Sequence, residues 1–296
     1  MQVPFTLRPH KLFCSDLIID EESGVSVQQA IAVLDSGVGG LTVVKEVLRQ
    51  LPHEKILYFG DTARTPYGPR EAEEVITFTR EIVDYLVQFN PKMIVIACNT
   101  ATAVALEDIR TRVNVPTIGV INPGARAAIG RTKTGVVGVI GTEGTIKSRA
   151  YEWALKRQSP SVTVISQACS SFVPLVEDGN FHSEETYQTV AESLSSLQNT
   201  TMDCLILGCT HYPFLADSIS KVMGSEVTLI NSAEETAREI STILQENNEL
   251  AGIDVEPVHQ FFCSGDPRKF QEIAQAWLEE QIQLFPVVWQ VSSIGV

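Results

Sequence analysis

Residues 94–101, IVIACNTA, form a short apolar run that ends on a cysteine and continues with two small polar residues. A run of this length and composition is typical of a strand buried on both faces of a parallel sheet. The residues that follow at 101–113, ATAVALEDIRTRV, have a helical composition. The stretch therefore predicts a βα unit whose cysteine lies at the carboxyl end of a strand, where open parallel sheets bind ligands.

The same alternation of short apolar runs and helical segments extends along the chain from residue 31. The other runs are IAVLD (31–35), KILYFGD (55–61), PTIGVI (116–121), GVVGVIGT (135–142), SVTVISQA (161–168), CLILGC (204–209) and EVTLI (226–230). Such alternation predicts an α/β protein with mainly parallel sheets covered by helices. No run reaches the length of a membrane span, and the first residues lack the apolar core of a signal peptide.

A second stretch, LILGCTHY at 205–212, repeats the pattern of the first. It is again a buried apolar run that ends on a cysteine. Each half of the chain also has a Gly-rich turn with hydroxyl residues after its first strand: LDSGVGGLT (34–42) in the first half and IGTEGTIKS (140–148) in the second. The distance from Asp35 to Cys98 is 63 residues, and from Thr142 to Cys209 it is 67. We therefore predict two pseudo-symmetric units that place one thiol on each side of a shared cleft.

Two thiols on opposite sides of one carbon atom suit a reaction that inverts a stereocentre, because one group removes a proton and the other returns one to the far face. The amino terminus of a following helix is expected to lower a thiol pKa from its usual value of about 8.5. Asp35 and His211 are candidates for moving protons to and from the thiols. Neutral donors could hold a small zwitterion with an extra carboxylate: Ser36, Asn99, Thr100, Thr142, Thr145 and Thr210.

The composition disfavours some classes of function. The chain has 296 residues and a net charge of −14, and no cluster of Lys and Arg stands out, so nucleic-acid and anionic-membrane binding are disfavoured. Six cysteines without a C-x-x-C pair indicate reduced thiols in a cytoplasm. Cys204 is interpreted as a core residue, and the three tryptophans, Trp153, Trp277 and Trp289, as packing residues.

At this point the sequence resembles the glutamate racemases of the aspartate/glutamate racemase superfamily. The resemblance covers most of the chain from residue 31 and is carried by LDSGVGGLTV (34–43), DTARTPYG (61–68), ACNTA (97–101), GTEGTIKS (141–148), FVPLVEDG (172–179) and GCTHYP (208–213). It implies a two-base racemase without cofactor or metal that converts L-glutamate to D-glutamate for peptidoglycan.

The resemblance also implies roles for individual residues. Cys98 is expected to act on the D-enantiomer and Cys209 on the L-enantiomer, with Asp35 and His211 assisting them. Asp61 and Glu177 fall on supporting acidic positions. The positions that contact substrate are expected to be Ser36, Pro66, Tyr67, Gly68, Asn99, Thr100, Thr142, Thr145 and Thr210.

For domain organisation we expect an extension at 1–30, a first α/β domain at 31–124 and 236–296, a second at 125–235, and an active site between the two. The resemblance implies a homodimer. Because some racemases with amino-terminal extensions are activated by a muramyl-peptide precursor, such an activator is a further expectation.

Other interpretations stay open on the residues alone. Gly37, Gly39 and Gly40 follow a strand as in a dinucleotide site, with Asp61 as the acidic residue, but position 42 is Thr where that motif needs a third glycine. Cys98, Cys209 and His211 could form a metal site, although no zinc-type cluster surrounds them. A non-catalytic binding module, or a racemase for aspartate or hydantoins, would share much of the pattern.

Overall fold

The computed structural model describes residues 5–7, 29–179, 181, 183–253, 256–278, 282–287 and 289–291. The predicted extension at 1–30 therefore lies mostly outside the described residues. Its strand β1 (Phe5–Leu7) pairs antiparallel with β12 (Trp289–Val291). In the ranges that the structure covers, no helix is long and apolar enough to cross a lipid bilayer.

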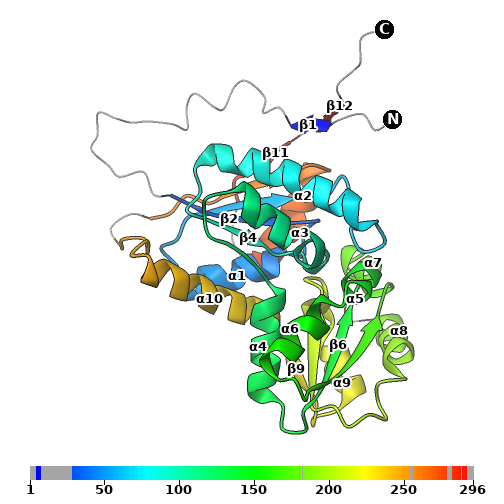
Figure 1. The fold of residues 1–296 in the computed structure, drawn as a ribbon. Coiled ribbons are helices and arrows are strands. Elements are labelled where there is room, and N and C mark those ends of the chain that lie inside the picture. The colour runs from blue at the N-terminus through cyan, green and yellow to red at the C-terminus, as the bar shows by residue number, and fades with distance from the viewer. Residues whose placement is uncertain are drawn as a thin grey trace, which may run out of the picture.

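The rest of the described chain forms two parallel sheets (Figure 1). Within the described residues, six strands make the first sheet, in the order β11 (Leu284–Pro286), β10 (Gln260–Cys263), β3 (Ile56–Gly60), β2 (Ile31–Asp35), β4 (Met93–Ile96) and β5 (Thr117–Gly119). Four strands make the second, in the order β7 (Thr163–Ala168), β6 (Val136–Gly141), β8 (Cys204–Gly208) and β9 (Thr228–Ile230). These sheets confirm the predicted α/β class.

Helices separate the strands along the chain. They are α1 (Leu41–Gln50), α2 (Ala72–Leu86), the 3₁₀ turn η1 (Val87–Phe89), α3 (Asn99–Arg112), α4 (Ile121–Arg131), α5 (Glu143–Lys147), α6 (Ala150–Gln158), α7 (Phe172–Glu177), α8 (Glu184–Leu194), the 3₁₀ turn η2 (Tyr212–Leu215), α9 (Ala216–Met223), α10 (Ser232–Glu246) and α11 (Pro267–Leu278).

The central strands β2, β3, β4 and β8 are buried on both faces, which explains why they are almost wholly apolar, whereas the edge strand β7 is partly exposed. In β2, Ile31 and Val33 face a cluster with α1, α10 and α11, whereas Ala32 and Leu34 face a cluster with α2 and α3, because successive side chains point to opposite faces. Figure 1 shows α2 and α3 on one side of this sheet and α1 and α10 on the other. The second sheet is covered in the same way, by α4 and α6 on one face and by α7, α8 and α9 on the other.

The two sheets share one strand order, which supports the internal repeat. In each unit the first strand (β2 or β6) lies between the second (β3 or β7) and the third (β4 or β8), and the fourth (β5 or β9) follows the third. The motifs that end in Cys98 and Cys209 therefore occupy equivalent places.

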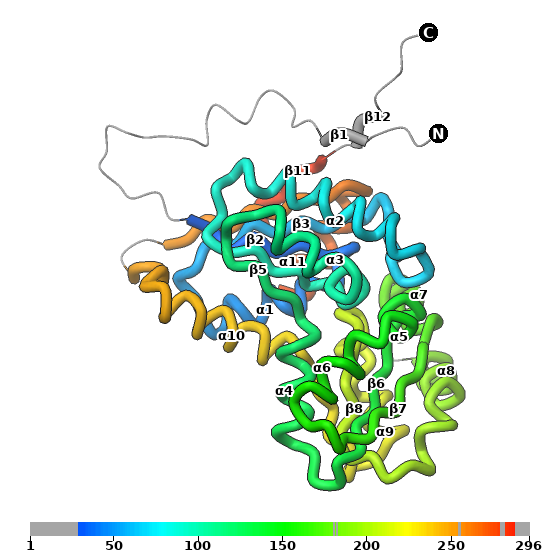
Figure 2. The backbone as a smooth tube through the Cα atoms, in the orientation of Figure 1, coloured from blue at the N-terminus to red at the C-terminus, as the bar shows by residue number. Residues whose placement is uncertain are grey.

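Helix α4 is an element that the sequence analysis does not predict. Its segment contains Pro123 and Gly124, which usually interrupt helices. Pro123 is tolerated because it lies in the first turn, where backbone N–H groups have no partner within the helix. Figure 2 shows the chain entering the second unit through α4 and returning through α10, and these two helices contact each other. The predicted domain limits at residues 124 and 236 fall inside them and stay a prediction.

A buried ion pair fixes the amino-terminal ends of β3 and β4. Lys92 Nζ lies 2.6 Å from Glu54 Oε2, and the two side chains are only 6% and 2% exposed. Lys92 Nζ also donates to the Glu249 carbonyl, and Glu54 Oε1 accepts from the Ala251 backbone N–H. The pair therefore holds the loop after α10 against the first sheet.

We expect Glu54→Gln to lower the free energy of unfolding by about 3–5 kcal/mol, because it leaves the Lys92 charge buried without a counter-charge. Urea unfolding followed by circular dichroism measures this. The matched control is Asp84→Asn, which breaks the exposed pair with Arg112 and should cost about 0–1 kcal/mol. Equal losses in the two variants would contradict the role given to the buried pair.

Candidate active site

The candidate site lies where the strand order reverses in both sheets. In the first unit the chain passes from β2 to β3 on one side, while β4 lies on the other side of β2. Loops that leave β2 and β4 therefore diverge and open a crevice at their carboxyl ends. Asp35 ends β2 and Cys98 closely follows β4; Thr142 and Cys209 occupy the corresponding places after β6 and β8.

Cys98 is the amino-terminal cap of α3. Its Sγ accepts a hydrogen bond from the Ala101 backbone N–H at 3.5 Å, and its thiol donates to Ser36 Oγ at 3.6 Å. Burial and the negative charge of Asp35 raise the pKa of Cys98 to about 12, more than these hydrogen bonds lower it. The backbone N–H at the start of α3 lowers this pKa, as expected, but burial and the charge of Asp35 outweigh it.

Cys209 lies beside His211, and His211 lies beside Glu177. His211 Nδ1 is 3.8 Å from Cys209 Sγ, and His211 Nε2 is 3.4 Å from Glu177 Oε1. Burial lowers the pKa of His211, but its hydrogen bonds to Cys209 and Glu177 and the charges of Cys209 and Asp35 outweigh burial and raise it to about 10. His211 is consequently an imidazolium at neutral pH.

The regular helix that follows Cys209 begins several residues after the cysteine. Turn η2 comes first, and α9 starts only at Ala216. Pro213 lies in η2 and lacks the N–H that a regular helix interior requires, so the regular helix forms after it. The imidazolium of His211, and not a helix terminus, is the positive group beside this sulfur.

Asp35 joins the two units through its hydrogen bond with Thr210. It is fully buried, and its carboxylate accepts hydrogen bonds from Gly37 N–H at 3.0 Å and from Thr210 Oγ1 at 3.3 Å. Burial raises the pKa of Asp35, although the positive charge of His211 and these hydrogen bonds oppose the rise. Close approach requires glycine at position 39, since a Cβ there would lie 2.4 Å from Thr210 Oγ1 and 2.6 Å from His211 Nδ1.

A cluster of three threonines joins the two units at a second place. Thr100 Oγ1 is 2.9 Å from Thr142 Oγ1 and 3.3 Å from Thr145 Oγ1, and the last two oxygens are 3.0 Å apart. The carbonyl of Gly68 accepts from Gly144 N–H at 2.8 Å, and a Cβ on Gly68 would lie 2.6 Å from Thr142 Cβ. Predicted site residues that follow three strands, β3, β4 and β6, thus meet at one place.

Asp61 and Tyr67 form a separate network beside this cluster. The Asp61 carboxylate accepts from Arg64 Nε at 2.6 Å, from Ser264 Oγ at 2.7 Å and from the Tyr67 hydroxyl. Its oxygens are thus engaged within the protein, which suits a positioning role better than proton transfer. Pro66 lies in the same loop and is exposed.

Sequence reasoning missed several participants. The Tyr151 hydroxyl donates to Asn99 Oδ1 at 2.7 Å, Thr65 Oγ1 lies 3.5 Å from Glu177 Oε1, and Arg64 and Ser264 hold Asp61. Tyr151 lies on the buried face of α6, where an aromatic residue is ordinarily a core residue, so no sequence pattern distinguished it. Among the described residues, no group of three or more His, Cys, Asp or Glu side chains is arranged to hold a metal ion.

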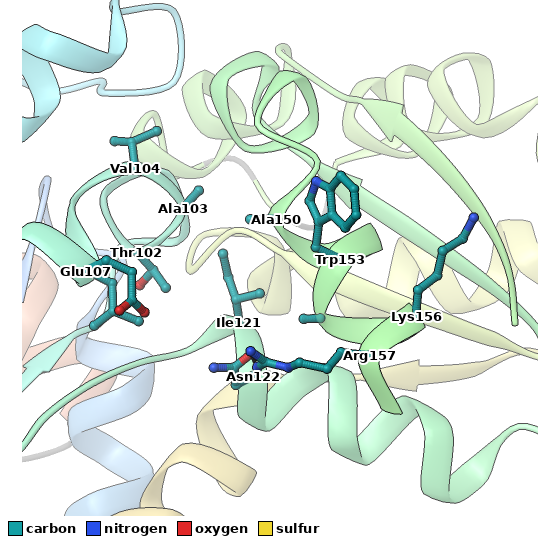
Figure 3. A pocket seen from close by; sticks show the side chains of 12 residues that line it. Thr102, Ala103, Val104, Glu107, Ile121, Asn122, Ala150, Trp153, Lys156 and Arg157 are labelled. Atoms are coloured by element: carbon teal, nitrogen blue, oxygen red, sulfur yellow. Dashed lines mark hydrogen bonds between the residues drawn. The ribbon is translucent and has the colours of Figure 1, made fainter. Parts of the chain in front are cut away.

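A groove of about 660 Å³ lies elsewhere, between α3, α4 and α6 (Figure 3). None of the predicted site residues, all of which are described, lines it. Trp153 lines the groove and is 66% exposed, so its predicted packing role is wrong. The reason is helical geometry: Tyr151, Ala154 and Leu155 form the buried face of α6, and position 153 points away from it.

The other interpretations of buried residues fare differently. Cys204 is fully buried in the core of the second unit, as predicted. Trp277 stacks on Phe214 with ring centroids 3.6 Å apart, which confirms its packing role. The side chain of Trp289 lies outside the described part of the structure.

The raised pKa of His211 predicts a pH dependence of stability. Its folded-state pKa of about 10 exceeds its ordinary value of 6.5. The contribution of the protonated ring is therefore fully present below pH 6.5 and is lost as the pH rises through 10. We expect the difference in unfolding free energy between the wild type and His211→Asn to shrink across this range in urea titrations at successive pH values.

The companion variant is Glu177→Gln, which should move the loss to lower pH because it removes one stabilising partner of the imidazolium. A ring that titrates near pH 6.5 by NMR in the wild type would contradict the assignment.

Comparison with known proteins places this geometry in a family. The sequence profile described as Asp/Glu/Hydantoin racemase matches residues 31–240. A glutamate racemase from Bacillus cereus is 53% identical over 259 residues, which are 88% of this chain and 96% of that protein. The crystal structure of a glutamate racemase isoform from Bacillus anthracis superimposes with a TM-score of 0.85 at 49% identity and covers 87% of this chain and 97% of its own.

A glutamate racemase from Francisella tularensis, solved in complex with D-glutamate, gives a TM-score of 0.83 at 33% identity, with 90% of this chain and 99% of that one covered. Profile, sequence and structure agree over most of the chain. The protein belongs to the Asp/Glu/hydantoin racemase family.

Proposed function

We propose that the protein is a glutamate racemase, a cofactor-independent two-base enzyme that interconverts L-glutamate and D-glutamate and supplies the D-enantiomer for peptidoglycan. The observation that carries the proposal is the pair of thiols at equivalent strand ends of two units with one strand order. Cys98 and Cys209 are close enough that charge on Cys209 contributes to raising the pKa of Cys98. The relatives at about half identity are glutamate racemases, which supports glutamate over aspartate or a hydantoin.

The two thiols have unequal surroundings, which assigns their roles at the start of a turnover. In the direction from L to D, Cys209 acts as a thiolate and removes the α-proton, with the His211 imidazolium 3.8 Å from its sulfur to balance the charge. Cys98, which burial keeps protonated, delivers its proton to the opposite face of the planar carbanion. The turnover leaves a Cys209 thiol and a Cys98 thiolate.

A proton must then return from one side to the other. We assign this step to Asp35 and His211, since Asp35 influences the pKa of both Cys98 and His211. Glu177 keeps the imidazolium in place. In the reverse direction Cys98 is the base and Cys209 is the acid.

The substrate is held by neutral donors, which reconciles an acidic protein with an acidic ligand. Hydroxyl groups and the Asn99 amide supply these donors, and the amino terminus of α3 adds favourable backbone dipoles next to Cys98. The residues assigned to this role are Ser36, Tyr67, Gly68, Asn99, Thr100, Thr142, Thr145 and Thr210, with Pro66 in the loop that carries Tyr67.

We expect Cys98→Ser and Cys209→Ser each to reduce racemisation by about 10²–10⁴-fold or more, because each removes the acid–base group of one face. Incubation with L-glutamate in D₂O without added cofactor, followed by optical rotation and NMR, measures inversion and deuterium at the α-carbon. Cys204→Ser is the control: it changes a buried thiol of the strand that leads to Cys209 and should leave racemisation intact. Near wild-type racemisation by either active-site variant would contradict the proposal.

We also propose that the protein is a homodimer in which the groove between α3, α4 and α6 receives the partner. Trp153, which is 66% exposed, lines the groove, and large aromatic residues are frequent anchors of interfaces. Its rims carry opposite charges, with Glu107 on α3 and Lys156 and Arg157 on α6 (Figure 3). A two-fold axis would bring the acidic rim of one copy to the basic rim of the other.

Trp153→Glu should weaken dimerisation by about tenfold or more, since it places an unpaired charge at the centre of the contact. Sedimentation velocity over a range of protein concentrations measures the dissociation constant. Ile253→Glu, at an exposed apolar position outside the groove, is the matched control. An unchanged dimer in the Trp153 variant, or a monomeric wild type, contradicts this interface.

The remaining expectations stay part of the proposal. A cytoplasmic location is supported by the cysteines, since Cys98, Cys169, Cys204, Cys209 and Cys263 are all free. Activation by a muramyl peptide rests on the resemblance alone, and residues 1–4 and 8–28 lie outside the described ranges.

A further inference from the structure

We propose that Tyr151 is a positioning residue that fixes the orientation of the Asn99 side-chain amide and so presents its NH₂ group to the substrate. The inference rests on the proposed function, because the carboxylate that the amide would bind belongs to glutamate. It starts from one hydrogen bond between the two units: the Tyr151 hydroxyl donates to Asn99 Oδ1 at 2.7 Å.

In the side-chain amide of Asn99, the oxygen has a hydrogen-bond partner and the nitrogen has none among the described residues. Asn99 is 3% exposed and is the first residue of α3, directly after Cys98. Its Oδ1 accepts from Tyr151, whereas its Nδ2 is buried and has no hydrogen-bond partner among the described residues. A primary amide donates only through its nitrogen, so fixing the oxygen on Tyr151 directs both N–H groups away from that ring. A buried donor without a partner is the arrangement expected of a group that awaits a ligand.

A third residue meets the same hydroxyl group. Burial raises the pKa of Tyr151, and a hydrogen bond between its hydroxyl and the Ser232 side chain opposes the rise. Asn99 Oδ1 carries no proton and can only accept, so the single Tyr151 proton is donated to it. The Tyr151 oxygen then accepts from Ser232, and the chain of donors runs from Ser232 on α10 through Tyr151 on α6 to Asn99 on α3.

The ring of Tyr151 is itself held in a narrow slot. Tyr151 is 2% exposed, and a Cβ on Gly208 would lie 3.1 Å from its Cε2. A Cβ on Gly124 would lie 3.5 Å from its hydroxyl oxygen. The hydroxyl therefore has little freedom, and the orientation of the amide is set by a residue of the opposite unit.

The expected kinetic effect is distinctive. An amide that holds a carboxylate contacts both enantiomers alike, so its loss weakens ground state and transition state together. Tyr151→Phe, which removes only the hydroxyl, should raise KM about tenfold in both directions and change kcat less. A general loss of structure at the cleft would lower kcat instead, and damage to one thiol would affect the two directions unequally.

The test is a double-mutant cycle with Asn99→Ala. Tyr151→Phe should change KM in the wild-type background and have little effect once Asn99 is alanine. Ser232→Ala is the second variant: it removes the donor to Tyr151 without touching the slot and should raise KM in the same sense by a smaller factor. An unchanged KM in Tyr151→Phe, or an equal rise in the Asn99→Ala background, overturns the proposal.

A measurement on the ligand-free protein separates this proposal from the proposed function. The side-chain amide signals of Asn99, assigned by their absence in Asn99→Ala, should shift in the ¹H–¹⁵N NMR spectrum of Tyr151→Phe. If they do not move, the positioning role fails even in an active racemase. If they move in a protein that does not racemise glutamate, the hydrogen bond stands and the proposed function fails.

Discussion

The site depends on how closely two half-similar units approach each other. Neither unit supplies a complete set of acid–base groups, so the active site depends on the seam, by which we mean the contact between the two units where backbones and short side chains meet. Gly39 admits Thr210 and His211, and Gly68 admits Thr142. Across this seam Asp35 accepts from Thr210, and Thr100 meets Thr142. Any side chain at the two glycines would separate the groups that must face one carbon atom.

The seam also explains the electrostatics. Excluding water raises the pKa values of Asp35 and Cys98, whereas His211 gains a proton because negative groups surround it. The two thiols are therefore chemically unlike although their motifs are alike. Tertiary contacts cause this asymmetry. Glu177 contacts His211 from another element of the same unit, and Asp35 lies near Cys98 on the neighbouring strand.

Much of this organisation could be predicted from the sequence. Buried runs predicted the strands, and the repeat of IVIACNT and LILGCTH predicted two equivalent cysteines, because both signals are local. The features that could not be predicted from the sequence depend on tertiary contacts. Helix α4 forms despite Pro123 and Gly124, the Cys98 pKa rises where a helix terminus suggested a fall, and Trp153 faces outward because its neighbours form the buried face. Tyr151 resembled a core residue, and only its partner Asn99 shows its other use.

The position of β10 in the first sheet has a consequence for how the chain is made. Strand β10 pairs with β3, and Gln260 lies opposite Leu57, so about two hundred residues intervene. The four strands of the second sheet are, by contrast, consecutive along the chain. During synthesis the second unit is complete before the first sheet receives its last strands, and closing so long a loop slows folding. The first sheet is thus finished after the second, although its first strand comes earlier in the sequence.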